Sequence, residues 1–318
     1  MAKQNKYFSS ITKKDYLLFQ DFFKHQKYTY GNSWTYIVQG MYGIGKDGLG
    51  FKYFDGKNLC AVCVYPKIET PEVNMFYWVR PMGDTILDVI KNVSNDIKFS
   101  KYIKKLHIEQ YTYLKKFGFI DVKDYPWYST IPAEDDTFPE KILDVKKTII
   151  IANKLGKTRQ LNRTLMNFKY YKRNKQLSEA SIFDENMKTW NVLSKFFEYI
   201  KSKGLANVST PYDYHNLIYG IVKKDTIIEK LILLDNEPIG FYLAEIQNSK
   251  YASLYATITN RKVYNNLTDY IMFDLFARLQ DKGVKYLNLG GSEHKSLNDF
   301  KDKFRPVESK KMLWLYKP

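Results

Sequence analysis

The chain has 318 residues, of which 44% are hydrophobic and 16% aromatic. This length suits one large or two ordinary domains, and this apolar content is enough to build buried cores, which excludes an intrinsically disordered protein. No apolar run reaches the roughly 18–20 residues that span a bilayer, and the N-terminal stretch lacks the apolar core of a secretory signal. We therefore expect a cytoplasmic protein without an integral membrane segment.

The formal net charge is +16. Lysine supplies most of the basic residues, and Asn, Ile, Tyr and Phe are also abundant, a combination typical of an AT-rich genome. A charge of this size also attracts polyanions such as nucleic acids. From composition alone, both explanations of the charge remain open.

The two cysteines, Cys60 and Cys63, lie three residues apart in the apolar run NLCAVCVY. On a strand, an odd spacing points two side chains to opposite faces of the sheet. That arrangement suits neither a redox pair nor a shared metal ion, so we predict that both cysteines pack in the core.

The common motifs for nucleotide binding, metal binding and covalent catalysis are lacking. Gly43-x-Gly45-x-x-Gly48 has the spacing of a dinucleotide fingerprint, but it leads into an aromatic strand, so we interpret these glycines as turns. The four histidines lie far apart in the sequence, and there is no Gly-x-Ser-x-Gly motif. An enzyme with this sequence would rely on positioning and electrostatics, with no metal and no bound cofactor.

The first half, residues 1–140, opens with a helical pattern in TKKDYLLFQDFFKHQ. The runs SWTYIVQGMYGI, GFKYF, LCAVCVYP and NMFYWV are predicted as strands of an antiparallel meander, because Asp-Gly between aromatic runs is a hairpin signal. A helix in GDTILDVIKNVSNDIKF and a short strand in KLHIEQY follow.

The second half, residues 141–318, opens with a basic connecting helix within residues 136–175 and then repeats this order. A hairpin (IIEKLILL, DNEP, IGFYLAEIQ) leads to the strand YASLYATI, the helix LTDYIMFDLFARLQDKG and the strand KYLNLGG. The chain closes with a helix in KSLNDFKDKF and a strand in KKMLWLY. We predict an α/β (α+β) protein of two similar domains, 1–140 and 141–318, each a mixed, mostly antiparallel sheet flanked by helices.

The closing segment resembles a known group of proteins. The run YLNLGGSE (286–293) is followed by Leu297-x-x-Phe300-Lys301-x-Lys303-Phe304-x-Pro306. A glycine-containing strand end followed by Phe-Lys-x-Lys-Phe and a proline resembles the end of the Fem-type peptidoglycan aminoacyltransferases. It is also similar to the C-terminal domain of lysyl-phosphatidylglycerol synthases. Both kinds of protein carry two GNAT-like domains in tandem, and the resemblance covers roughly residues 140–318.

This resemblance implies an acyltransferase that moves an acyl or aminoacyl group to an amine or hydroxyl, while nearby donors stabilise the oxyanion without a metal. The first candidate donor is aminoacyl-tRNA, which makes tRNA a partner, and the acceptor is a small molecule or a cell-envelope precursor. Acyl-CoA is the alternative co-substrate. The loop that holds coenzyme A in GNAT enzymes is glycine-rich and lies at a helix N-terminus. The corresponding loop here, TNRKVYNN (259–266), has no glycine, and the copy in the first half, RPMGDT (80–85), has one.

The resemblance also implies site residues. Lys301 and Lys303 are the candidates for contacts to a phosphate or to the oxyanion, and Glu293 is the candidate base. Six further residues are predicted to bind the donor or its phosphates: Gly290, Gly291, Ser292, Arg261, Arg159 and Arg163. The glycines would let the backbone approach the donor closely.

Alternative interpretations stay open at this point. Leu297, Phe300 and Phe304 have the spacing of the core face of a helix, so we expect them to be buried whatever the function. Lys301 and Lys303 would then be ordinary solvated lysines. A different class of function is a non-catalytic protein that binds RNA or single-stranded DNA through basic helices and exposed aromatic side chains.

Overall fold

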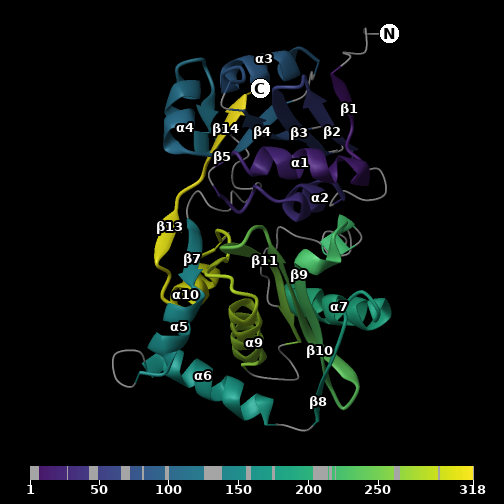
Figure 1. Cartoon of the computed structure of the whole chain (residues 1–318), viewed down its shortest axis with the longest axis vertical. Helices are drawn as coiled ribbons and strands as arrows, with labels where there is room; N and C mark the ends of the chain where they lie inside the picture. The colour runs from purple at the N-terminus through teal and green to yellow at the C-terminus, as the bar shows by residue number, and fades with distance from the viewer. Residues whose placement is uncertain are drawn as a thin grey trace. The chain divides into compact units, whose positions relative to one another are not determined.

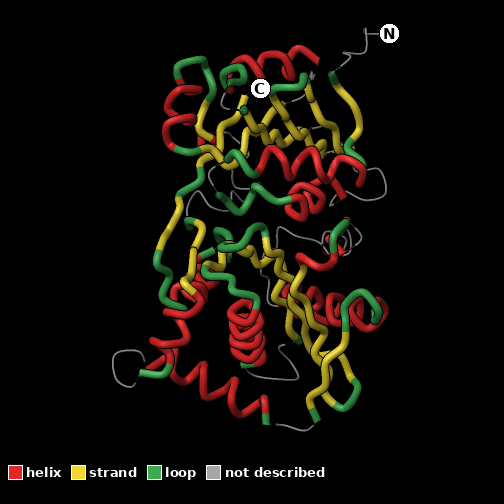
Figure 2. Tube along the Cα trace, viewed as in Figure 1, coloured by secondary structure: helices red, strands yellow, loops and turns green. Residues whose placement is uncertain are grey.

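A computed structural model of the chain describes residues 7–26, 28–42, 49–65, 72–80, 82–96, 100–124, 138–154, 159–173, 176–202, 214, 217–218, 220–260, 266–292 and 294–317. The chain divides into two compact units of mixed helix and strand (Figure 2). Unit 1 comprises Met1–Thr137, Tyr219–Val222 and Lys311–Pro318, and unit 2 comprises Phe138–Ile218 and Lys223–Lys310.

The described residues of unit 1 form a seven-stranded sheet in the order β1-β2-β3-β4-β5-β14-β6 (Figure 1). Its strands are β1 (Phe8–Ser10), β2 (Leu49–Phe54), β3 (Asn58–Tyr65), β4 (Glu72–Val79), β5 (Ser100–Leu106), β6 (Ile120–Asp121) and β14 (Leu313–Lys317). β2, β3 and β4 pair as an antiparallel meander, which confirms the predicted one, and β4 pairs with β5 in parallel.

Helices cover both faces of this sheet. The side chains of a strand alternate between the two faces, and β4 has apolar side chains on both. On one face, Val73 and Met75 of β4 pack in a core with Ile90 of α3. On the other face, the rings of Phe76 and Trp78 contact aromatic residues of α2 and α1. The helices are α1 (Tyr16–Phe23), α2 (Trp34–Tyr42), α3 (Ile86–Asp96) and α4 (Ile108–Lys115), with short 3-10 helices at Lys13–Asp15 and Val122–Asp124.

The run SWTYIVQGMYGI, predicted as a strand, contains helix α2, so that prediction is wrong. Its aromatic and β-branched composition favours a strand, but Trp34, Ile37 and Val38 have the i, i+3, i+4 spacing of a helix face. All three are buried, and Nε1 of Trp34 donates to the carbonyl oxygen of Gly220 at 3.0 Å. The periodicity was therefore the better guide here. The glycines at 43, 45 and 48 lie outside the described residues, so their interpretation as turns stays a prediction.

Cys60 and Cys63 lie on β3, and both are free and fully buried, which confirms their prediction as core residues. Burial raises the pKa of the Cys60 thiol far above its ordinary value. Burial also raises the pKa of Cys63 to about 12, although the charge of Lys104 opposes this shift. Neither thiol is a nucleophile at neutral pH.

Unit 2 has a seven-stranded sheet among its described residues, in the order β13-β7-β12-β11-β10-β9-β8. Its strands are β7 (Glu140–Asp144), β8 (Leu177–Ala180), β9 (Ile227–Leu234), β10 (Glu237–Ile246), β11 (Tyr251–Thr259), β12 (Tyr286–Asn288) and β13 (Glu308–Lys310). β9 and β10 form the predicted hairpin, with Asp235 and Asn236 at positive φ in the turn. β11 is antiparallel to β10 and parallel to β12, so the predicted repeat of strand order is confirmed.

The helices of unit 2 are α5 (Val145–Ala152), α6 (Arg159–Lys172), α7 (Asn186–Ser202), α9 (Leu267–Asp281) and α10 (Lys295–Asp302), with a 3-10 helix at Lys224–Thr226. The segment predicted as one basic connecting helix is the strand β7 followed by two helices, α5 and α6. Phe304 is fully buried in the core, as predicted, whereas Leu297 and Phe300 are only half-buried. None of the helices in the described residues is long and apolar enough to cross a membrane.

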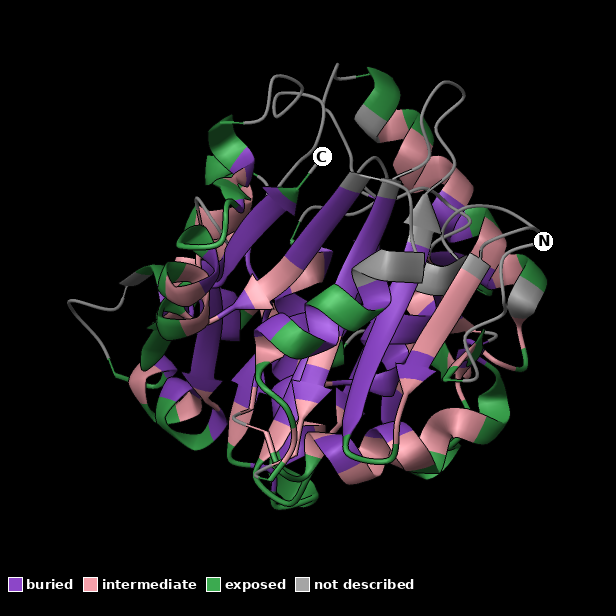
Figure 3. Ribbon diagram, turned by 90° about the horizontal axis from the view of Figure 1, so that it is seen from above, coloured by how far each residue is buried: buried purple, intermediate pink, exposed green. Residues whose placement is uncertain are grey.

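Burial follows the sheets: buried residues concentrate along the strands, and exposed ones lie on helix surfaces and turns (Figure 3).

The last strand, β14, belongs to the sheet of unit 1. The sequence-based boundaries assign residues 311–318 to the second domain, but β14 inserts between β5 and β6 of unit 1. Leu315 of β14 is fully buried in the unit 1 core. The chain therefore needs its last residues to complete its first sheet.

We expect Leu315→Ala to lower the free energy of unfolding by about 3 kcal/mol, because a buried leucine loses its contacts and leaves a cavity. The matched control is Val307→Ala, where the side chain is 42% exposed and the expected loss is below about 1 kcal/mol. Urea unfolding would measure both, and hydrogen exchange should show faster exchange at β5 and β6 in the Leu315 variant. Equal losses for the two variants would contradict the placement of β14.

Candidate functional site

In unit 2, two neighbouring parallel strands separate partway along their length. β11 and β12 pair over three residues, ending with Ser253 opposite Asn288, although β11 continues to Thr259. β12 also pairs with β7 on its other edge, and beyond Asn288 this pairing continues, since the amide of Leu289 donates to the carbonyl oxygen of Lys141 at 2.8 Å. The carboxyl ends of the two strands therefore diverge, and ligands of α/β sheets bind at such places.

Two linked, buried hydrogen bonds hold the end of β12, which turns away from β11. Nδ2 of Asn288 donates to Oε2 of Glu140 at 2.7 Å, and the amide of Gly290 donates to Oδ1 of Asn288 at 2.8 Å. Glu140 and Asn288 are both fully buried. Gly290 has a φ of 67°, a conformation that favours glycine. Buried polar groups are costly unless they are bonded, so these contacts hold the strand end in one geometry.

Lys301 of α10 packs against the same strand end. Its side chain is buried, and Nζ donates to the carbonyl oxygen of Gly290 at 3.2 Å and to that of Gly291. An ammonium group bonded to two carbonyl oxygens fixes the position of the glycine pair. The structure thus brings together three of the predicted site residues, with Lys301 contacting the backbone. The predicted catalytic role of Lys301 stays a prediction.

Ser292, two residues beyond Gly290, is fully buried. Its amide donates to the carbonyl oxygen of Phe138 at 3.2 Å, whereas its Oγ has no hydrogen-bond partner among the described residues. Nearly all buried polar atoms in native proteins are hydrogen-bonded, so an exception calls for a physical reason. The Ser292 hydroxyl therefore has a hydrogen-bonding capacity that no described group of the protein uses.

Lys303 contacts a different part of the unit. Its Nζ forms an ion pair with Oδ1 of Asp269, in the first turn of α9, and Asn167 donates to Oδ2 of the same carboxylate at 3.1 Å. Lys303 is two residues from Lys301, and side chains two positions apart on a helix point in different directions. A carboxylate already lies in the first turn of α9, at the helix end that attracts phosphates.

The remaining predicted residues are not part of the described cluster. Arg261 and Glu293 lie outside the described residues. Arg159 begins α6, but its side chain is not described, and Arg163 is exposed on the same helix. Their roles as phosphate contacts and as a base stay predictions.

Sequence reasoning missed Glu140, Asp269 and the role of Asn288. A polar residue at the end of an otherwise apolar strand is a weak signal for Asn288. Glu140 has no local signal, because its partner Asn288 is 148 positions away in the chain. Asp269 resembles an ordinary first-turn carboxylate, and only the fold shows that Lys303 pairs with it.

Unit 1 repeats the separation of strands. β5 pairs with β14 from Lys101 to Leu106, whereas its parallel pairing with β4 ends at Met75 opposite Ile103. At this point Nζ of Lys104 lies 3.9 Å from the ring centroid of Trp314 on β14. The two units therefore share the backbone arrangement, while unit 1 has a lysine–tryptophan contact near its separated strands.

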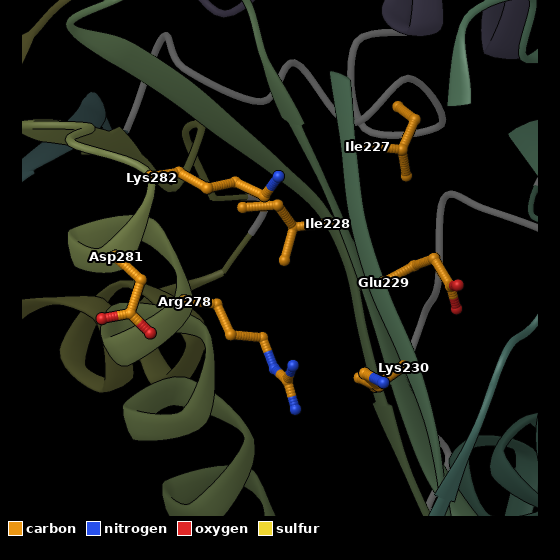
Figure 4. Close-up of a pocket in the computed structure, with 7 residues that line it drawn as sticks. All are labelled: Ile227, Ile228, Glu229, Lys230, Arg278, Asp281 and Lys282. Atoms are coloured by element: carbon orange, nitrogen blue, oxygen red, sulfur yellow. The ribbon is translucent and has the colours of Figure 1, made fainter. Parts of the chain in front are cut away.

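A pocket of about 300 Å³ lies at the other end of α9 from the separated strands (Figure 4). Its lining residues come from β9 and the C-terminal end of α9: Ile227, Ile228, Glu229, Lys230, Arg278, Asp281 and Lys282. Arg278 donates to Glu179 at 2.7 Å, and Lys230 lies 3.4 Å from the same carboxylate. Basic side chains at a helix C-terminus also offset the helix dipole. We interpret the pocket as the surface of an ion-pair network that joins α9 to the sheet.

The same network includes a buried tyrosine. The hydroxyl of Tyr242 donates to Oδ2 of Asp274 at 2.6 Å, and Arg278 donates to that oxygen at 2.8 Å. Burial, followed by the Asp274 charge, raises the pKa of Tyr242 far above its ordinary value. Tyr242 therefore stays protonated at any physiological pH, and its role is to anchor β10 to α9. Among the described residues, no three His, Cys, Asp or Glu side chains are placed to hold a metal ion.

No protein-family model matches this chain, and no curated protein matches its sequence. Solved structures do match along nearly the whole chain. FemX matches with a TM-score of 0.61 and 12% identity, over 97% of this chain and 96% of FemX. L-PGS from Bacillus licheniformis matches with a TM-score of 0.61 and 12% identity, over 94% of this chain and 90% of L-PGS. A tandem GNAT protein from the clavulanic acid biosynthesis pathway matches with a TM-score of 0.56 and 8% identity, over 98% and 97%.

The chain has a tandem GNAT fold. The resemblance predicted from the closing segment is thereby confirmed at the level of fold, as is the α/β class with two mixed sheets flanked by helices. Identities this low establish the fold alone, and function has to be argued from the site of this chain. In the tandem GNAT fold of this chain, the separated strands of unit 2 and the cluster around Gly290 are that candidate site.

We expect Lys301→Met to lower the free energy of unfolding by about 2–3 kcal/mol, because two buried carbonyl oxygens lose their donor. The control is Lys295→Met in the same helix, where the lysine side chain is 78% exposed and the expected change is within about 0.5 kcal/mol. Urea unfolding of both variants checks this. If Lys301→Met proves as mild as its control, Lys301 does not hold the glycine pair.

Proposed function

We propose that this protein is an acyltransferase that moves an acyl or aminoacyl group from an ester of a carrier to an amine or hydroxyl acceptor. The observation that carries this proposal is the buried, unpartnered Oγ of Ser292 at the separated strands. Ser292 follows the glycine pair Gly290-Gly291, which Lys301 and the hydrogen bonds of Glu140 and Asn288 hold in place. The tandem GNAT fold, shared with FemX and L-PGS, supports the reaction class.

In the proposed reaction, the acceptor nitrogen or oxygen attacks the carbonyl carbon of the ester. The new bond forms as the bond from that carbon to the carrier oxygen breaks, and the proton lost by the acceptor ends on the released carrier hydroxyl. Negative charge develops on the carbonyl oxygen during the attack. A fixed donor stabilises that charge best when its position is set beforehand. The Ser292 hydroxyl is the proposed donor, Lys301 positions the backbone before it, and Glu293 is the candidate base.

The proposed donor is aminoacyl-tRNA. The α9 N-terminus, where GNAT enzymes hold the pyrophosphate of coenzyme A, here follows a loop without glycine and carries the carboxylate of Asp269 in its first turn. That carboxylate, paired with Lys303, already occupies the helix end that would otherwise attract another anion. FemX matches in fold, and the closing segment of this chain resembles the Fem-type group, for which aminoacyl-tRNA is the implied donor. Because that donor is cytoplasmic, the proposal places the reaction in the cytoplasm, with a small molecule or a cell-envelope precursor as acceptor.

Acyl-CoA remains the second candidate donor, because it is the alternative co-substrate that the resemblance implies and a tandem GNAT protein, whose structure was solved without acetyl-CoA, shares the fold. The experiment offers the purified protein either a pool of radiolabelled aminoacyl-tRNA or labelled acetyl-CoA. Both are tested with a panel of peptidoglycan precursors, lipid headgroups and small amines. We expect transfer from aminoacyl-tRNA only. Tight binding of coenzyme A together with transfer from acetyl-CoA would reject the tRNA donor, and no transfer from either would favour a non-catalytic binding protein.

Ser292→Ala tests the proposed role of the hydroxyl. Removal of one oxyanion donor lowers kcat by about 100-fold in enzymes of known mechanism, and we expect a loss of this order. Stability should be unchanged or higher by up to about 1 kcal/mol, because an unbonded buried hydroxyl is removed. The control is Ser309→Ala on an exposed position of β13, for which neither quantity should change. A loss of stability with unchanged kcat would reject the role.

A further inference from the structure

The most unbalanced charge in the chain lies between Val145 and Ser178. These 34 residues contain ten Lys or Arg and no Asp or Glu, whereas the whole chain has 50 Lys or Arg and 34 Asp or Glu. The segment therefore holds ten of the sixteen surplus positive charges. A bias of genome composition toward lysine acts along the whole chain and does not exclude acidic residues from one segment. The local excess calls for a local reason.

Helix α6, together with Arg173 directly after it, presents three exposed cations on one side. The side that carries Leu161 and Leu165 is buried in the unit 2 core, where α6 packs against α9. Arg163, Lys169 and Arg173 are exposed. At 3.6 residues per turn, these three positions fall within about a third of the circumference of the helix. α6 therefore has one apolar side used by the fold and one basic side that faces solvent.

Two large side chains lie within the same basic side. Tyr170 is 69% exposed and Met166 is 47% exposed. The ring of Tyr170 contacts the ring of Tyr171 edge-on, with centroids 5.5 Å apart, and Tyr171 is buried. Tyr170 thus contacts a buried ring while most of its own side chain stays exposed. We define Arg163, Met166, Lys169, Tyr170 and Arg173 as the α6 stripe.

The charges of the α6 stripe are not compensated by described residues. Neither Arg163, Lys169 nor Arg173 forms an ion pair with any residue that the structure describes. Helices α9 and α10 differ, since Arg278 pairs with Asp274 in α9 and Lys295 pairs with Asp299 in α10. Surface helices commonly balance their charges by such pairs four residues apart. An unbalanced stripe creates a positive potential suited to a polyanion.

We propose that the α6 stripe is a docking surface for the phosphate backbone of RNA, with Tyr170 stacking on a base or ribose. Single-stranded and looped RNA binds to surfaces where cations contact its phosphates and an exposed aromatic ring stacks on a base. A membrane surface fits less well, because amphipathic helices bind bilayers through a broad apolar side, and that side of α6 is buried. The identification of this RNA as tRNA rests on the proposed function, whereas the docking surface itself does not.

The test compares two triple variants of the full chain for binding to purified deacylated bulk tRNA over a range of salt. The stripe variant combines Arg163→Ala, Lys169→Ala and Arg173→Ala. The control variant removes the same charge from exposed positions of unit 1, with Lys13→Ala, Lys14→Ala and Lys24→Ala. We expect the stripe variant to bind at least about 30-fold more weakly at low salt, with a salt slope smaller by about two to three. The control should lose less than about threefold.

Tyr170→Ala separates stacking from charge. We expect about tenfold weaker tRNA binding with an unchanged salt slope, because a base contact is lost and no phosphate contact is. Circular dichroism of each variant checks that α6 remains folded, and all four substituted side chains are exposed.

Each outcome decides between the proposals. Equal tRNA binding by the stripe and control variants overturns the docking surface, even if the protein transfers aminoacyl groups. Stripe-dependent tRNA binding without any aminoacyl transfer supports the docking surface and counts against the proposed function. Binding to phosphatidylglycerol vesicles that is lost in the stripe variant, while tRNA binding is kept, assigns the stripe to a membrane and overturns the inference.

Discussion

Two parallel strands can separate inside a protein only if the backbone groups that they release find other partners. In unit 2 this requirement is met by β7 and by Lys301. The amide of Leu289 and the carbonyl oxygen of Gly290 bond to Lys141 on β7, and the ammonium group of Lys301 bonds to Gly290 and Gly291. The site depends on these contacts, because without them the backbone groups beyond β12 would be left without hydrogen-bond partners where β11 and β12 separate.

The cost of these contacts is that charged groups are buried. Glu140 and Lys301 lie away from water, and a buried charge stabilises a protein only when its hydrogen bonds are complete. Such groups hold one geometry well, because every alternative leaves a charge unbonded. That rigidity matches the needs of the proposed reaction, in which the Ser292 hydroxyl must already be in place when charge develops.

Local patterns in the sequence were enough to predict most helices and hairpins, because their apolar spacing is set by neighbours in the chain. The prediction was wrong at α2, where we weighted the strand-like composition around Trp34 above its helical spacing. It was also wrong over most of KLHIEQY, predicted as a strand, because β5 ends at Leu106 and α4 begins at Ile108. Long-range pairings were beyond sequence reasoning. Nothing local indicates that Glu140 bonds to Asn288, or that β14 completes the sheet of unit 1. The closing motif indicated that Lys301 and the glycine pair belong to one site. Only the structure shows that the Lys301 ammonium group bonds to the carbonyl oxygens of the two glycines.

The placement of charge in unit 2 connects the proposed donor with the proposed docking surface. A small pyrophosphate needs one focus of positive potential, and a helix N-terminus with free amides supplies it. In this chain the first turn of α9 carries Asp269, and Lys303 is committed to that carboxylate. The three cations of the α6 stripe, which form no ion pair with a described residue, are instead spread from Arg163 to Arg173, or about 15 Å along the helix axis. Phosphates distributed along a nucleic acid strand match such a stripe, whereas a single pyrophosphate would engage only part of it.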